Sequence, residues 1–151
     1  MVTIPATLDL IPGSAFRYCT NLEKIVFHEP SIKWGTDNTT FFGDCVKEIG
    51  VYAFADCTSL QSVEFKNGLS KIEAAAFENC CNLKNITFSE TITTLENNAF
   101  ANCHSLESVE LPSNITEFVG AFNNCTNLTT ITVAISSFGF EGCESLSEIR
   151  I

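Results

Sequence analysis

Apolar residues recur along the chain in a unit that repeats every 22 to 23 residues through residues 57–125. In each unit a leucine is followed, after three and five residues, by two apolar residues that flank a polar one. This alternation predicts a short strand with one buried face. A second apolar pair, spaced by three residues as in Leu69 and Ile72, predicts one tight helical turn on the path back to the next strand.

Each unit also carries a phenylalanine followed three residues later by a cysteine, and alanine usually precedes the phenylalanine. These pairs end at Cys19, Cys45, Cys57, Cys80, Cys103, Cys125 and Cys143. A unit of this length forms one strand and a return path but cannot bury its own apolar face, so neighbouring units must stack. The pattern predicts a solenoid of about six coils, in which equivalent Leu, Phe and Cys side chains form ladders.

Three stretches depart from the regular unit. The 38 residues from Leu22 to Leu60 exceed one repeat by 15, so residues 28–45 are either a repeat with an insertion, which we favour, or two compressed coils that share Phe42 and Cys45. The step from Cys125 to Cys143 is only 18 residues, which predicts a shortened return path. Both ends of the chain match strand positions without polar capping repeats. We therefore expect residues 1–151 to be a single solenoid from a longer array.

The unit at residues 60–80, L-x-x-V-E-F-x-x-G-L-x-x-I-x-x-x-A-F-x-x-C, resembles the BspA-type leucine-rich repeat of surface proteins from bacteria and parasitic protists. The resemblance implies a strand-dominated α/β fold, a right-handed leucine-rich-repeat solenoid with a parallel concave sheet and short helical turns on the return path. It also implies cell adhesion or protein binding, and a cell-surface or secreted location. In the general leucine-rich pattern asparagine follows the strand. Here it does so only at Asn114, which predicts no continuous asparagine ladder at that position.

Charge narrows the possible partners. The chain has 8 basic and 18 acidic residues and a net charge of −10, which disfavours nucleic acid and anionic lipid surfaces as partners. We find no apolar run long enough to cross a membrane, so we expect no membrane insertion. Residues 1–5 lack the features of a secretory signal. We therefore expect either a chain that stays inside its cell or a piece of a longer protein.

The eight cysteines are the main candidates for chemistry. Ladder thiols on neighbouring coils would lie close enough for disulfides, but zinc sites need converging ligands, whereas these cysteines recur once per coil. We expect buried, reduced thiols that pack as small apolar side chains. Cys81 lies outside the ladder, and we expect it to react with a thiol probe.

Other sequence features give no indication of catalysis. Neighbouring residues rarely face each other, so we do not expect Cys103 and His104 to form a nucleophile and base. We expect a non-enzymatic protein without cofactor or metal site. Sequons of the form Asn-x-Thr predict possible glycan acceptors, of which Asn38 would be the most accessible; they begin at Asn38, Asn85, Asn114, Asn124 and Asn127.

The polar residues of each strand are the candidate binding residues. They alternate with core residues and should therefore form columns across the concave sheet, a surface that solenoids use for binding. The predicted contact residues are Ser62, Glu64, Lys66, Asn85, Thr87, Ser89, Ser108, Glu110, Thr130 and Thr132. We expect a protein or glycan partner. Alternative hypotheses are a structural scaffold that self-associates through uncapped solenoid ends, and a thiol-based redox or metal protein.

Overall fold

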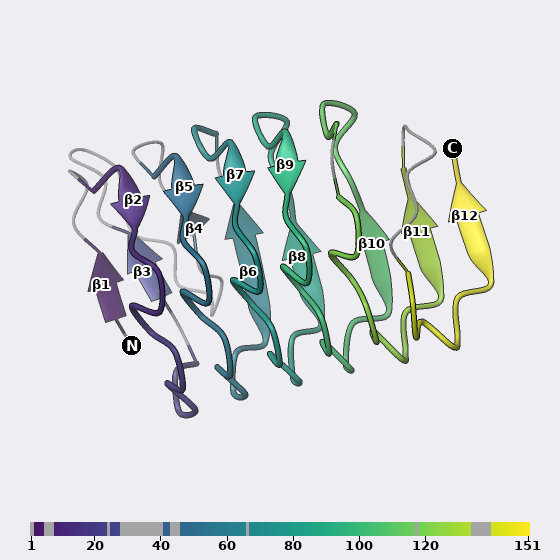
Figure 1. The fold of residues 1–151 in the computed structure, drawn as a ribbon, viewed down its shortest axis with the longest axis horizontal. Coiled ribbons are helices and arrows are strands. Elements are labelled where there is room, and N and C mark those ends of the chain that lie inside the picture. Colours follow the sequence, from purple (N-terminus) through teal and green to yellow (C-terminus); the bar gives the residue numbers. More distant parts are fainter. Residues whose placement is uncertain are drawn as a thin grey trace.

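The computed structural model describes residues 2–4, 8–23, 25–27, 41–42, 46–65, 67–116, 118–133 and 140–151. Within these residues it is built from short parallel strands joined by turns, without a helix (Figure 1). The strands are β1 (Val2–Ile4), β2 (Leu10–Ile11), β3 (Ile25–Phe27), β4 (Phe41–Phe42), β5 (Glu48–Ile49), β6 (Ser62–Phe65), β7 (Lys71–Ile72), β8 (Asn85–Thr87), β9 (Thr94–Leu95), β10 (Ser108–Glu110), β11 (Thr130–Thr132) and β12 (Glu148–Arg150). The predicted strand-dominated solenoid is confirmed.

One side of the array, here called the long-strand face, consists of β1, β3, β4, β6, β8, β10, β11 and β12. Parallel pairing joins β1 to β3, β4 to β6 and β8, and β10 to β11 and β12. The three sheets follow one another because β3 lies beside β4, and β8 beside β10. Val63, Val109 and Ile131 point into the core. The alternation seen in the sequence therefore describes these strands correctly.

A second sheet covers another side of the coils. Its order is β2-β5-β7-β9, and its residues pair in register, so that Ile11, Ile49, Ile72 and Leu95 form one buried row. The spacing of Leu69 and Ile72 predicted a helical turn here, but Ile72 lies in a strand. A helix would use its N–H groups within its own coil, whereas this segment donates to the preceding coil, as in the 2.9 Å bond from Glu73 N–H to the Ile49 carbonyl.

In the turns between the second sheet and the next long strand, successive N–H groups donate alternately to carbonyls of the same coil and of the next coil. Ala53 and Ala55 donate within the coil to the carbonyls three residues back, over 3.0 and 3.2 Å. Phe54 donates instead to the Ala76 carbonyl of the next coil, over 2.7 Å. Each turn segment is therefore also a rung of a hydrogen-bonded ladder. The same alternation recurs coil after coil, and it fixes the coils in register.

Two positions in these turns take a left-handed backbone. Non-glycine residues there are Ser14, Tyr18, Tyr52, Asp56, Ala75, Asn79, Asn98, Asn102 and Asn124, with φ between 55° and 62°. Asparagine tolerates this conformation better than most residues, and glycine takes it freely at Gly120 and Gly142. The amides also join the coils: Asn79 Nδ2 donates to Asp56 Oδ1, and Asn102 Nδ2 to Asn79 Oδ1, both over 2.8 Å. This amide ladder lies on the turns. It does not involve the position after the strand, where asparagine occurs only at Asn114.

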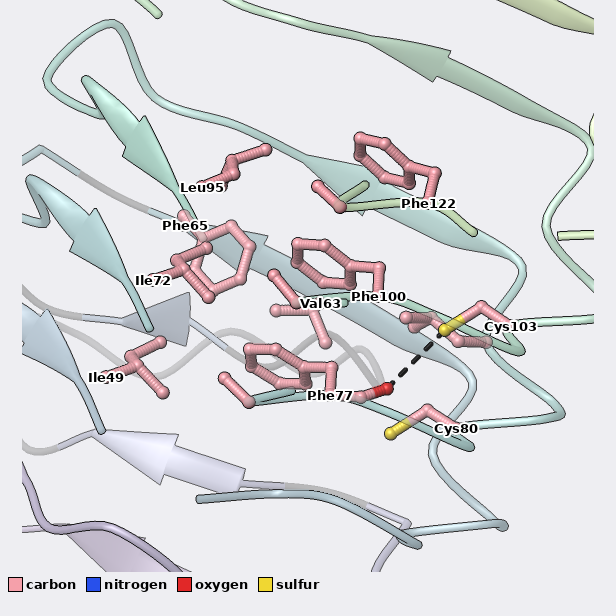
Figure 2. Close-up of a cluster of buried hydrophobic side chains, with 14 of the residues drawn as sticks. Ile49, Val63, Phe65, Ile72, Phe77, Cys80, Leu95, Phe100, Cys103 and Phe122 are labelled. Carbon is pink, nitrogen blue, oxygen red and sulfur yellow. Dashed lines mark hydrogen bonds between the residues drawn. The ribbon is translucent and has the colours of Figure 1, made fainter. Parts of the chain in front are cut away.

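A file of stacked phenylalanine rings runs through the core (Figure 2). Ring centroids of neighbours are 5.1 to 5.5 Å apart with interplanar angles of 6° to 17°, in the order Phe16, Phe54, Phe77, Phe100 and Phe122. The file passes directly from Phe16 to Phe54. Phe42, which its spacing to Cys45 assigned to this file, instead lies in β4 opposite Phe65 of β6. The rest of segment 28–45 is outside the described residues.

Candidate functional site

The long-strand face brings most of the predicted contact residues into columns. Ser62 pairs with Asn85 and Glu64 with Thr87, while Ser108 pairs with Thr130 and Glu110 with Thr132. Asn85, Thr87, Ser108 and Glu110 are exposed, and Ser62, Glu64, Thr130 and Thr132 are half-buried. Parallel, in-register pairing thus places eight of the ten predicted side chains on one surface. Lys66 lies outside the described residues.

Ser89 does not belong to this surface. Its side chain is buried, and its hydroxyl lies 2.9 Å from that of Thr91. The Thr91 hydroxyl in turn donates to the Leu69 carbonyl over 2.8 Å and accepts the Gly68 N–H over 3.1 Å. The expectation of an outward Ser89 is wrong because β8 ends at Thr87, so strict alternation stops before this residue. Ser89 has a structural role in joining two coils.

A depression of about 300 Å³ lies on the long-strand face where β8 and β10 meet. Its lining is formed by Ile86, Thr87, Phe88, Glu90, Glu110, Leu111 and Pro112. Two of the predicted contact residues, Thr87 and Glu110, are among them. The sequence did not indicate this depression, because β8 and β10 match the repeat as well as their neighbours do.

Some charged side chains elsewhere in the described part of the chain form ion pairs. Arg150 makes two bonds to Glu148, of 2.9 and 3.0 Å. On the second sheet the Lys71 ammonium lies 2.7 Å from Glu96 and 3.3 Å from Glu73. The hydrogen bond that the Lys71 ammonium donates to Glu96 raises the pKa of Lys71. Of these contacts, the one between Lys71 and Glu96 joins two coils.

Five of the ladder cysteines are hydrogen-bond donors, and four of these are fully buried. Each of these S–H groups donates to the carbonyl of the phenylalanine one coil back, over 3.1 to 3.5 Å, from Cys57, Cys80, Cys103, Cys125 and Cys143 to Phe16, Phe54, Phe77, Phe100 and Phe122 respectively. Figure 2 shows the bond from Cys103 to Phe77. Burial raises the pKa of the Cys57 and Cys125 thiols to about 12 and that of the Cys80, Cys103 and Cys143 thiols as well. The seven described cysteines are free thiols. A protonated, buried thiol is a poor nucleophile.

Two cysteines bear on the remaining chemical hypotheses. Cys103 is fully buried, while His104 is exposed and lies 3.4 Å from the Thr126 hydroxyl. The Cys103 thiol is directed to Phe77, which fits the expectation that Cys103 and His104 do not act together. Cys81 is half-buried outside the ladder, and its reaction with a thiol probe stays a prediction. Among the described residues, no group of His, Cys, Asp or Glu side chains could hold a metal ion.

A family model for the BspA type leucine rich repeat region matches residues 1–42 and 37–147, in 6 copies. The chain belongs to the BspA-type leucine-rich repeat family. Proteins of this kind are typically non-enzymatic interaction or adhesion modules. The A-F-x-x-C motif, with its stacked phenylalanines and buried cysteines, is therefore a core signature of the BspA-type repeat in this chain.

Solved structures agree with this assignment. The leucine-rich repeat protein TpLRR of T. pallidum is 28% identical, with a TM-score of 0.82 over 99% of this chain and 68% of that one. A leucine rich cell surface protein of Faecalibacterium prausnitzii is 26% identical, with a TM-score of 0.74 over 95% of this chain and 48% of that one. The pneumococcal vaccine antigen PcpA, 24% identical with a TM-score of 0.70 over 98% of this chain and 44% of that one, shares the fold.

The BspA-type chain spans about half the length of the last two proteins. No curated protein matches it. In the described part of the chain, none of the segments forms a helix that is long and apolar enough to cross a membrane. Self-association through the ends of the array stays a prediction.

Proposed function

We propose that the chain is a non-enzymatic binding module whose long-strand face contacts a protein or glycan outside the cell. The observation that carries this proposal is the set of exposed polar side chains on β8 and β10, the strands between which the depression lies: Asn85, Thr87, Ser108 and Glu110, of which Thr87 and Glu110 line it. On the turn side of the coils, polar side chains such as Asn79 and Asn102 are engaged in the amide ladder. Solenoids use such extended faces for binding.

The comparisons support a surface or secreted location. The protein from Faecalibacterium prausnitzii is described as a cell surface protein, and PcpA as a vaccine antigen. Short polar side chains with isolated charges favour a contact spread over several coils. We infer that a partner binds across β6, β8, β10 and β11.

Charge reversal at Glu110 tests this function. Glu110→Lys should weaken capture of whichever partner binds the wild-type chain in a panel of purified secreted proteins and glycans, measured by surface plasmon resonance. Glu110 is exposed, so the melting temperature should not change. Glu144→Lys, an exposed change of equal charge on another coil, is the matched control. If the Glu110 variant and the control bind every captured partner as wild type does, the binding surface is elsewhere.

A further inference from the structure

The hydrogen-bond ladder of the long-strand face is interrupted between β3 and β4 and again between β8 and β10, and only at the second break are all the neighbouring residues described. Before β8 and before β11, the N–H of the last residue ahead of the strand donates to a carbonyl of the preceding coil. Lys84 N–H donates to the Gln61 carbonyl and Thr129 N–H to the Glu107 carbonyl, each over 2.9 Å. The equivalent bond from Glu107 to Lys84 is missing, and no ladder pair joins β8 to β10, although all these residues are described. The two strands lie beside each other but leave their facing edges open.

Intact bonds between the two coils close this gap at both ends. On one side Ser105 N–H donates to the Cys81 carbonyl over 3.2 Å. On the other, Asn114 Nδ2 donates to the Glu90 carbonyl over 2.7 Å and Thr116 N–H to the Thr93 carbonyl over 3.0 Å. The opening is therefore confined to the strands, and the adjoining bonds hold its shape.

The opening exposes apolar side chains that are covered in the neighbouring coil. Ile86 and Phe88 are half-buried, whereas their counterparts Val63 and Phe65 are 1% and 2% exposed. The Phe88 ring is fixed by packing against Phe65 at 5.6 Å and against Phe100 at 5.8 Å between centroids. Leu111 and Pro112 line the opposite wall of the depression. Ordered apolar side chains thus form part of its lining, beside the polar Thr87, Glu90 and Glu110.

The rim of the depression is acidic. Glu90 and Glu110 are both exposed, and no salt bridge to either carboxylate occurs within the described ranges. The Ser113 hydroxyl lies 3.4 Å from Glu90 Oε2. Apolar side chains and two carboxylates in one lining match a side chain with an aliphatic stem and a cationic head. The volume of about 300 Å³ is at the lower end of ligand pockets, which suits one side chain.

We propose that this depression receives a lysine or arginine side chain of a protein partner. The proposal rests on the function proposed above and names the chemistry of the contact. The stem packs on Ile86, Phe88 and Leu111, and the cationic head lies between Glu90 and Glu110. The net charge of −10 favours approach of a cationic segment.

A peptide titration tests the depression directly. The probe is acetyl-Gly-Gly-Lys-Gly-Gly-amide, added to the isotope-labelled full chain and followed by amide chemical shifts. We expect shifts concentrated at residues 86–90 and 110–112, and none with the norleucine analogue, which keeps the stem but lacks the charge. Glu110→Gln should weaken the interaction about two- to fivefold, as for an exposed ion pair. Glu144→Gln is the matched control and should bind the peptide as wild type does.

Shifts that are absent, scattered over the acidic surface or equal for the norleucine peptide would overturn the cationic anchor. The test also separates this inference from the proposed function. If Glu110→Lys prevents partner capture while the lysine peptide leaves residues 86–90 unchanged, the binding face stands and the anchor is wrong. If the peptide binds as expected while Glu110→Lys leaves capture unchanged, the anchor site stands and the proposed function fails.

Discussion

Each ladder cysteine meets two requirements at once. Its small, weakly polar side chain fits a fully apolar core, and its S–H reaches a carbonyl that needs a second partner. The Phe54 carbonyl, for example, accepts the Cys57 N–H and the Cys80 S–H, both over 3.3 Å. Alanine would leave this second bond unmade, and a carboxylate or amide would not fit. Sequence reasoning identified the apolar filler but not the donor, because no spacing rule indicates where a thiol proton points.

The thiols make stability depend on pH in alkaline solution. The pKa of a cysteine thiol in an unfolded chain is about 8.5. The pKa of the folded Cys57 and Cys125 thiols is about 12. Each such thiol therefore stabilises the fold fully below its unfolded pKa. As pH rises towards the folded value, the free energy of unfolding falls by about 1.4 kcal/mol per pH unit per thiol.

Urea unfolding at a series of alkaline pH values checks this prediction. Cys125→Ala removes one titrating group, so its stability should fall less steeply than wild type by about 1.4 kcal/mol per pH unit. Lys71, whose pKa is raised by Glu96, also loses its stabilising effect as pH rises, but equally in both proteins. Parallel curves for wild type and variant would show that the Cys125 thiol ionises alike in the folded and unfolded states.

At the scale of the elements, the turn segments repeat closely in structure although only part of their sequence repeats. Every coil needs a left-handed residue at the second turn position, taken by Tyr18, Asp56, Asn79, Asn102, Asn124 and Gly142. The motif A-F-x-x-C leaves this position open, although asparagine occupies it in three coils. The asparagines were therefore a usable signal for the turn. The second sheet was harder to predict, because a pair such as Ile92 and Leu95 suits a helical turn or a strand end equally well.

Asn102 tests how much this position contributes. Asn102→Ala should destabilise the fold by about 2 kcal/mol, since alanine is strained at a φ of 60° and the amide bond to Asn79 is lost. Asn102→Gly removes the same bond without the strain and should be milder. Urea unfolding of the two variants measures the difference. A glycine variant that is less stable than the alanine variant would contradict the argument.

The predictable part of the whole molecule is the part that repeats. The spacing of 22 to 23 residues predicts the strand positions, the buried leucines and the phenylalanine file, because stacked coils bring equivalent residues of neighbouring repeats into contact. The outward residues of the strands followed from the same alternation. The opening between β8 and β10 could not be predicted, because both coils match the repeat and the opening depends on the distance between their strands. Phe42, whose spacing to Cys45 matches the motif, lies in β4 opposite Phe65, and the phenylalanine file passes from Phe16 to Phe54 without it.

Stacking also determines how the molecule should unfold. Each coil is held by its two neighbours, so stability is roughly a sum of coil and interface contributions. Phe77 stacks on Phe54 and Phe100, both at 5.1 Å, and is fully buried. Phe140 is half-buried, with its ring 6.5 Å from Phe122. A defect at Phe77 therefore weakens two well-formed interfaces, whereas a defect at Phe140 weakens a looser one.

Phe77→Ala should cost about 3–5 kcal/mol and lower amide protection in the coils on both sides, from residues 50–57 to residues 96–103. Phe140→Ala should lower protection only in residues 118–125 and 140–146, and by less. Hydrogen exchange measured by mass spectrometry on both variants resolves the segments. If Phe140→Ala lowered protection at residues 50–57 as much as Phe77→Ala does, the coils would unfold as one cooperative unit, and nearest-neighbour coupling would not describe this array.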